Sequence, residues 1–321
     1  MSPDAIDISF IVIGYNESRH LEACLRSIQD AHLEGWSWEI IYADGASTDG
    51  SAAIAERIGV NRVVGGEKRR RAAENRNHGA AHARGVYLHF VDGDMVLHPA
   101  WPATAAAFMA DHPVAAAVCG ILEEVNDGLW HQVLELDWPA DEGAVESCGG
   151  CALFRRSAFE QAGGFPEDVA YGEEPYLCWR IRREQGLKIY QLPKVMAYHD
   201  LALAGFRSYW KQYVRNGRSY AEIAARCAGT DDPMWSRERR SNYIWGAIIV
   251  TILSASFFLS LWIDELFAFM ALLIIVRKFV QTVRRGTSLK VALVYALHTY
   301  FAKVPLAWGQ LRWWIENRRK G

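Results

Sequence analysis

The chain has 321 residues, of which 51% are apolar and 22% are charged, and its formal net charge is −2. It is long and apolar enough for one large domain with a full core, or for two modest domains. The lack of net positive charge argues against a nucleic-acid partner.

The charge is unevenly distributed along the chain. Residues 277–321 contain ten Lys or Arg and one acidic residue, Glu316, so the remainder carries the compensating negative charge. A basic, Trp-rich tail is typical of a segment that contacts an anionic membrane surface. The opening MSPDAIDISF lacks the basic start and apolar run of a signal peptide. We therefore expect a protein of the cell inner membrane whose front domain is cytoplasmic.

Apolar runs alternate with helical patterns in the first third of the chain. Apolar stretches predict strands at residues 8–13, 38–43, 62–64 and 86–91. Helical spacing predicts helices at residues 21–28, 51–58 and 72–84. This alternation predicts an α/β fold with a mostly parallel sheet and helices on its faces. After Pro113 the alternation weakens, and we expect a strand at 149–155, a helix at 173–184 and extended pieces at 188–192 and 196–199.

Polar residues follow three of the predicted strands. Tyr15, Asp44 and Asp92 lie at strand ends, and ligands of such sheets bind beyond the carboxyl ends of the strands. The Asp92-Gly93-Asp94 sequence offers two carboxylates of the kind that hold Mg²⁺ or Mn²⁺ against a diphosphate. Carboxylates also occur in ordinary turns, so the triplet alone does not identify a metal site.

Two apolar runs occur in the last third of the chain. Residues 243–263 contain no charge, and residues 266–276 are also apolar, with Asp264 and Glu265 between the runs. Basic residues on both outer flanks predict a transmembrane hairpin with its acidic turn on the far side. A shallow re-entrant hairpin and a buried helical pair in a soluble core are the alternatives. Residues 289–315 mix apolar, basic and Trp residues, as an amphipathic helix in the membrane interface does.

A series of motifs between residues 8 and 200 resembles, in order, the motifs of family 2 glycosyltransferases with the GT-A fold. They are residues 8–17, 43–51 (ADGASTDGS), 75–79 (NRNHG), 91–94, 149–156, 163–165 and 172–182 (GEEPYLCWRIR). The tail resembles that of membrane-anchored bacterial exopolysaccharide-type members. The resemblance implies a GT-A catalytic domain over residues 1–225, a linker over 226–242, a membrane hairpin over 243–283 and a basic interfacial tail over 284–321.

The same resemblance implies where a nucleotide sugar binds. The implied donor-site residues are Gly14, Tyr15, Asn16, Glu17, Asp44, Arg76 and Asp92. Tyr15, Asn16 and Glu17 would line the nucleoside pocket, Asp44 would accept from a ring N–H of the base, and Arg76 would approach the diphosphate. Without the resemblance, Asn16 could equally be a helix N-cap, and Arg76 could equally be an exposed helical residue.

The implied metal site and general base lie further along the chain. Asp94 would ligate Mn²⁺ or Mg²⁺, Asp92 would sit near ribose and metal, and His199 would complete the site, although a lone His is often structural. The family usually has Glu-Asp where this chain has Glu173-Glu174. We therefore expect Glu174 to be the base, with Glu173 its neighbour. Two acids at a helix start also complement the helix dipole.

The resemblance implies inverting, metal-dependent transfer of one sugar from a nucleotide diphosphate donor, a UDP-sugar, to a lipid-linked or glycan acceptor at the cytoplasmic membrane face. Residues 212–215 (QYVR) precede Asn216 where processive synthases carry a Trp, which favours a single transfer. Alternatives are transfer to a polyprenyl phosphate, and an inactive membrane scaffold that binds nucleotide sugar. The expected partners are the donor, the acceptor and anionic membrane lipids, with no nucleic acid.

Overall fold

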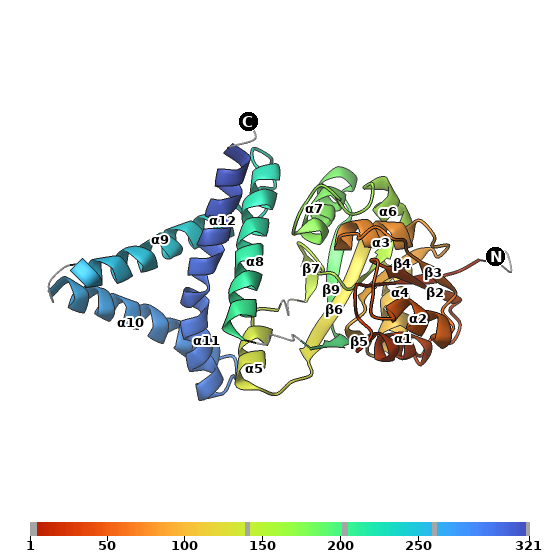
Figure 1. Cartoon of the computed structure of the whole chain (residues 1–321), viewed down its shortest axis with the longest axis horizontal. Coiled ribbons are helices and arrows are strands. Elements are labelled where there is room, and N and C mark those ends of the chain that lie inside the picture. The colour runs from red at the N-terminus through yellow and green to blue at the C-terminus, as the bar shows by residue number, and fades with distance from the viewer. Residues whose placement is uncertain (1–4, 139–141, 201–204, 259–261, 319–321) are drawn as a thin grey trace. The chain divides into compact units, whose positions relative to one another are not determined.

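The computed structural model describes residues 5–138, 142–200, 205–258 and 262–318 (Figure 1). The described residues fall into two compact units. Unit 1 is drawn from Met1–Val125, Pro139–Val169 and Glu173–Asp200, and unit 2 from Asn126–Trp138, Ala170–Gly172 and Leu201–Gly321. This division does not coincide with the expected boundary at residue 225, because the long helix α8 (Phe206–Arg226) belongs to unit 2.

Unit 1 is organised around a sheet that, within the described residues, has nine strands. In chain order they are β1 (Ile8–Gly14), β2 (Trp38–Asp44), β3 (Arg62–Val64), β4 (Tyr87–Asp92), β5 (Met95–Leu97), β6 (Ala115–Glu124), β7 (Gly143–Val145), β8 (Ala152–Arg155) and β9 (Lys188–His199). Their order in the sheet is β3-β2-β1-β4-β8-β6-β9-β5, with β7 also paired to β9.

The sheet is mixed, which corrects the expectation of a mostly parallel one. β1 runs parallel to β2 and β4, and β2 runs parallel to β3, because intervening helices supply the crossover that parallel pairing requires. β8 is antiparallel to β4 and β6, and β5 and β7 are antiparallel to β9. The weaker alternation after Pro113 therefore corresponds to a change in pairing, which single-strand patterns do not reveal.

Helices pack against this sheet through apolar side chains at helical spacing. They are α1 (Leu21–Gln29), α2 (Ser51–Ile58), α3 (Ala72–Ala80), α4 (Trp101–Asp111), α6 (Arg156–Gln161) and α7 (Glu173–Gln185). In α1 the buried residues Leu21, Cys24, Leu25 and Ile28 recur at the i, i+3, i+4 spacing that places them on one face. The four parallel strands and the helix at 51–58 confirm the sequence prediction. The helix predicted to reach residue 84 ends at Ala80, and the two extended pieces after residue 187 are one strand, β9.

Unit 2 consists largely of helices. They are α5 (Leu129–Glu135), α8, α9 (Ser236–Phe258), α10 (Trp262–Val283), α11 (Leu289–Phe301) and α12 (Lys303–Arg318). α8 and α12 run side by side (Figure 1), and a glycine from each marks the contact. A Cβ atom at Gly217 would collide with the Leu306 carbonyl, and one at Gly309 with the Val214 carbonyl. Glycine therefore allows the two backbones to approach closely.

The C-terminal helices differ from the sequence expectation in two ways. Among the described residues, no helix is both long enough and apolar enough to cross a membrane, so the expected transmembrane hairpin is not supported. Asp264 and Glu265 lie within α10 instead of forming a turn. The single amphipathic helix expected at 289–315 is two helices, α11 and α12. Pro305 has no N–H to donate to the Phe301 carbonyl, which accounts for the break near Ala302.

Candidate active site

The carboxyl ends of β1, β2 and β4 lie together at one edge of the sheet. The strand register sets Gly14 opposite Asp44 and Ile13 opposite Asp92. The Gly45 N–H also donates to the Gly14 carbonyl at 2.8 Å, which joins the two strand ends beyond the ladder. The predicted convergence of Tyr15, Asp44 and Asp92 at this edge follows from the register.

Asn16 connects the segment after β1 to the segment after β2. Its backbone has φ 57°, in the left-handed region that Asn tolerates better than most residues. Its N–H donates to Ser47 Oγ at 2.9 Å, and its Oδ1 accepts from the Thr48 N–H at 2.8 Å. The helix-capping alternative for Asn16 is excluded, since α1 begins after His20 and has no side-chain cap. Asn16 instead holds the two segments in register.

The Asp44 carboxylate is buried at the end of β2 and is fixed by two donors. The Ser47 N–H donates to Oδ2 at 2.8 Å, and the Tyr42 hydroxyl donates to Oδ1 at 3.1 Å. A Cβ atom at Gly65 would lie 3.1 Å from the Asp44 Cβ and 3.2 Å from the Asp44 carbonyl oxygen, so a glycine here lets the two backbones approach closely. A carboxylate oriented in this way is suited to accept a hydrogen bond from a ring N–H of a base.

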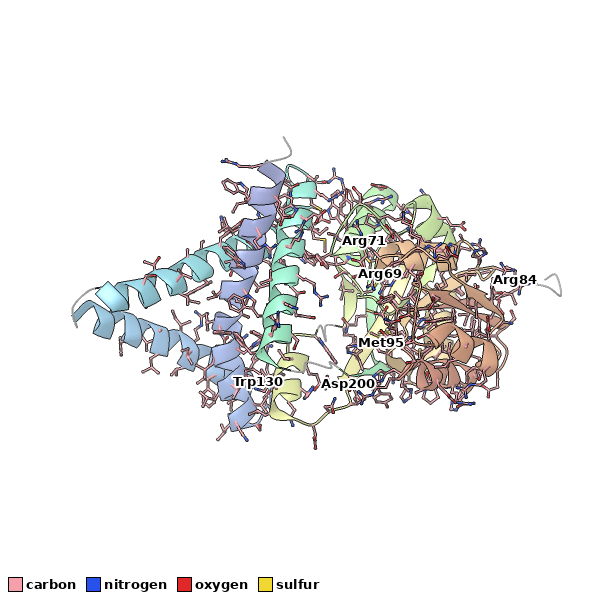
Figure 2. The ribbon with its side chains drawn as sticks, in the orientation of Figure 1. Arg69, Arg71, Arg84, Met95, Trp130 and Asp200 are labelled. Atoms are coloured by element: carbon pink, nitrogen blue, oxygen red, sulfur yellow. The ribbon has the colours of Figure 1, made fainter. Side chains whose placement is uncertain are left out.

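A basic segment that sequence reasoning did not assign lies beside Tyr15. Figure 2 labels Arg69. Its guanidinium carbon lies 3.3 Å from the centre of the Tyr15 ring, in a cation–π contact. Arg69 belongs to the run Lys68–Arg71, which precedes α3. This basic run could have been recognised in the sequence as part of the site, because clustered basic side chains near a strand-end site are suited to bind phosphate groups.

Arg76 is the buried centre of a charged cluster. Its Nη2 lies 2.7 Å from Asp92 Oδ1 and its Nη1 lies 3.0 Å from Glu173 Oε1. Burial alone would lower the pKa of Arg76, but the two carboxylates outweigh burial and raise it. Arg76 is therefore not the exposed helical residue that the alternative interpretation supposed. A Cβ atom at Gly150 would lie 2.7 Å from Nη2 and 3.2 Å from Asp92 Oδ2, so this glycine makes space for the ion pair.

Three further acidic or titratable groups surround the end of β4. His199 Nε2 lies 3.5 Å from Asp94 Oδ2, because β5 pairs Met95 with His199. Burial alone would raise the pKa of Asp94, but the hydrogen bond and the charge of His199, together with a backbone hydrogen bond and the charge of His20, outweigh burial and lower the pKa. The pKa of Glu17 is raised to about 7, first by burial and then by the negative charges of Asp94 and Asp92. The region thus carries an excess of negative charge.

A divalent cation fits this excess charge. Asp92, Asp94 and His199 do not together form a set of ligand atoms within 4.8 Å of one another, and Asp92 already pairs with Arg76. Mg²⁺ and Mn²⁺, however, commonly take only one or two protein carboxylates and complete their coordination with phosphate oxygens and water. Asp94 and His199 are the residues best placed to hold such an ion, with Asp92 beside them.

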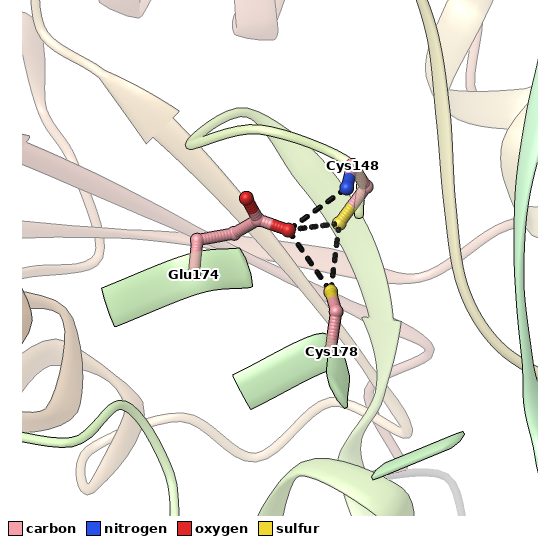
Figure 3. Close-up of side chains that lie close together, drawn as sticks. All are labelled: Cys148, Glu174 and Cys178. Carbon is pink, nitrogen blue, oxygen red and sulfur yellow. Dashed lines mark hydrogen bonds between the residues drawn. The ribbon is translucent and has the colours of Figure 1, made fainter. Parts of the chain in front are cut away.

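Glu174 points into a different environment from Glu173, although both lie at the start of α7. Its Oε1 accepts from the Cys148 N–H at 2.8 Å and from the Cys178 thiol at 2.9 Å, and the Cys148 thiol lies at 3.3 Å (Figure 3). Its other oxygen points away from both thiols. Burial raises the pKa of Glu174, which brings it closer to the range of a general base at neutral pH.

The first half of the chain matches known proteins. Residues 9–163, just under half of the chain, match the family described as Glycosyl transferase family 2. EpsE of Bacillus subtilis (strain 168) is 31% identical over 110 residues, which cover 33% of this chain and 39% of that protein. Glycosyltransferase AglE of Haloferax volcanii is 26% identical over 98 residues, which cover 29% and 32%. The matched region thus spans well under half of either relative.

Solved structures share the fold. Mannosyltransferase PcManGT from Pyrobaculum calidifontis, in complex with GDP-Man and Mn²⁺, has a TM-score of 0.65 at 21% identity over 92% of this chain and 87% of its own. S. aureus TarS 1-349 in complex with UDP-GlcNAc has a TM-score of 0.55 at 18% identity over 96% and 92%. At these identities the likeness shows the fold alone, a GT-A-like mixed sheet flanked by helices.

Proposed function

We propose that this chain, whose residues 9–163 match the family 2 glycosyltransferases, transfers a sugar from a nucleotide diphosphate donor to an acceptor hydroxyl. The proposal is based on one observation: the same edge of the sheet contains Asp44, Arg76, Asp92 and Asp94. These residues offer an acceptor for a base, a cation for a diphosphate and carboxylates for a divalent metal. Two proteins of similar fold were solved with nucleotide sugars, one of them with Mn²⁺, which supports this class of donor.

Each residue of the cluster has a proposed role in holding the donor. Asp44 accepts from the base, which we propose is uracil, and Gly14, Tyr15, Asn16 and Glu17 surround the nucleoside. Arg76 fixes the Asp92 carboxylate beside the ribose and provides positive charge near the diphosphate. Mn²⁺ or Mg²⁺, held through Asp94 and His199, would neutralise the charge that develops on the leaving diphosphate. Arg69, beside Tyr15, is a further cation close to the nucleoside.

We propose a single displacement with Glu174 as general base. The acceptor hydroxyl gives its proton to the Glu174 carboxylate while its oxygen bonds to the anomeric carbon. The bond from that carbon to the diphosphate breaks, and the configuration inverts. Glu174 suits this role because one oxygen is fixed by backbone and thiol donors while the other points away from them. Glu173 acts indirectly, by holding Arg76 in place.

Paired variants test the choice of base. General-base help contributes about 10²–10⁴-fold, so Glu174→Gln should reduce turnover by roughly that factor with little change in donor affinity. Glu174→Asp restores the usual family residue with a shorter reach, so partial activity is expected. Glu173→Gln should reduce turnover less and should weaken donor binding through Arg76. If Glu173→Gln has the larger effect on turnover, Glu173 is the base instead.

We further propose a lipid-linked or glycan acceptor at the cytoplasmic face of the inner membrane. Unit 2 supports this location, because α10 exposes Phe269, Leu272, Leu273 and Val276 and basic residues follow them. Membrane contact of this kind requires no spanning helix. Transfer to a polyprenyl phosphate is the variant of this proposal in which the acceptor oxygen belongs to a phosphate.

A donor screen tests the proposed function directly. The full-length protein is incubated with UDP-, GDP-, ADP- and dTDP-sugars in Mn²⁺, and the released nucleoside diphosphate is measured. We expect one donor class to be hydrolysed slowly without acceptor and faster with membrane lipid extract. If no donor is turned over but one binds, the chain is an inactive nucleotide-sugar-binding scaffold. If none binds, the assignment of Asp44 and Asp92 is wrong.

A further inference from the structure

An open depression of about 910 Å³ lies between the beginning of α9 and the end of α12, within unit 2. Three of its lining residues are the arginines Arg237, Arg239 and Arg240 on the first turns of α9. Trp313 and Trp314 of α12 line it as well. The depression therefore combines concentrated positive charge with large aromatic surfaces.

The three arginines of this depression form no ion pair with a carboxylate of the described residues. In the described part of unit 2, ion pairs between arginine and carboxylate use Arg218, Arg226 and Arg312, and none uses the three arginines of the depression.

Glu238 follows Arg237 in the chain but lies on another face of α9. Its charge acts on Lys303 and Tyr220. Asn242, four residues further along the same face, accepts from Lys303 Nζ at 2.7 Å. Glu238 is thus directed away from the arginines, which leaves them available to an anionic ligand.

An apolar surface continues from the depression along both helices. Ile244 and Leu311 line the depression, and both are exposed. Ile248 lies one turn beyond Ile244 on α9, and Trp308 lies one turn before Leu311 on α12, and both are also exposed. A small soluble anion would bury none of this apolar surface. The acyl chain of an anionic lipid would pack against it.

We propose that this depression binds the phosphate headgroup of an anionic phospholipid, with the acyl chains lying along the exposed apolar surface of α9 and α12. The arginines contact the phosphate through charge-assisted hydrogen bonds, for which guanidinium groups are suited. Trp313 and Trp314 take up the interfacial position that indole rings prefer. Unit 2 would thus attach to one leaflet by recognising headgroups, without spanning the bilayer. The site extends the proposed membrane location, but no step of catalysis depends on it.

Vesicle flotation of the full-length protein tests the site. The vesicles are phosphatidylcholine alone or phosphatidylcholine with phosphatidylglycerol, and inorganic phosphate is added as a soluble competitor. The test variant carries Arg237→Gln, Arg239→Gln and Arg240→Gln. The control variant loses the same charge from exposed positions on α8 of unit 2, through Arg207→Gln, Lys211→Gln and Arg215→Gln. Thermal unfolding checks that each variant is folded, and single Arg→Gln variants replace the triple variant if it is not.

We expect the wild type and the control to float with the anionic vesicles, and the test variant to bind them roughly 100-fold more weakly, because each basic residue near an anionic surface contributes substantially. Equal weakening of both variants would show diffuse electrostatic attraction and overturn the site. Displacement by inorganic phosphate would show a site for free phosphate. Failure of the wild type to bind anionic vesicles would also overturn the proposal, while donor turnover would remain a separate question.

Discussion

Replacing Arg76 by Met removes the cation that two carboxylates share. The Arg76 side chain is 5% exposed, whereas those of Asp92 and Glu173 are 31% and 19% exposed. Removing one partner of a fully buried pair costs about 3–5 kcal/mol, and an exposed pair contributes about 0–1 kcal/mol. Since both carboxylates here keep some contact with water, we expect Arg76→Met to lower the unfolding free energy by about 2–3 kcal/mol.

Arg57→Met is a matched control, because it measures how much unfolding free energy is lost when a paired but exposed arginine is removed. Arg57 pairs with Glu22 at 2.8 Å, but their side chains are 64% and 40% exposed, so Arg57→Met should cost less than about 1 kcal/mol. Arg76→Lys should recover only part of the loss, because a single ammonium group cannot reproduce the planar fork that contacts two carboxylates. Urea unfolding by circular dichroism, with calorimetry to separate the transitions of the two units, measures all three variants. If Arg76→Met costs no more than Arg57→Met, Arg76 does not organise the site.

Two further predictions concern neighbours of this cluster. Glu17 has its pKa raised from 4.5 to about 7, so the folded state binds its proton more tightly than the unfolded state does. The resulting stability is present at about pH 4 and is lost as the pH rises through 7. Glu17→Gln should flatten this part of the plot of unfolding midpoint against pH, and an unchanged slope would contradict the burial of its carboxyl. Gly150→Ala places a Cβ 2.7 Å from Arg76 Nη2 and should cost about 1–3 kcal/mol while weakening donor binding. Calorimetry and donor titration measure both effects, and wild-type values in both would mean that the space beside Arg76 is not restricted.

Local sequence patterns predicted the parallel half of the sheet and its polar edge. The strands that end at Gly14, Asp44 and Asp92 are apolar runs buried on both faces, so composition alone identifies them, and parallel pairing brings their ends together. By contrast, β5 and β7 are three residues each and were not recognised as strands. The mixed character of the sheet was missed for a different reason. The direction in which β8 pairs with β4 and β6 depends on contacts between distant strands, which the sequence of one strand does not reveal.

Contacts between distant segments could not be read from the sequence. The pairing of Arg76 with Glu173 joins residues 97 positions apart, and nothing local indicates that Glu173 and Glu174 face different surroundings. Hydropathy likewise suggested a spanning hairpin, although no described helix meets the requirements for one. The break before α12 was also missed, although Pro305 and its missing N–H donor were a local signal for it.

A divalent metal at Asp94 is the central element of the proposed mechanism. The direct measurement is the rate of nucleoside diphosphate release from the preferred donor, in Mn²⁺ and in EDTA, for the wild type and for Asp94→Asn. We predict that EDTA abolishes release by the wild type, that Mn²⁺ restores it, and that in Mn²⁺ Asp94→Asn is slower than the wild type by orders of magnitude while remaining folded. Full release in EDTA, or wild-type rates from Asp94→Asn, would contradict the proposed metal site and the mechanism built on it.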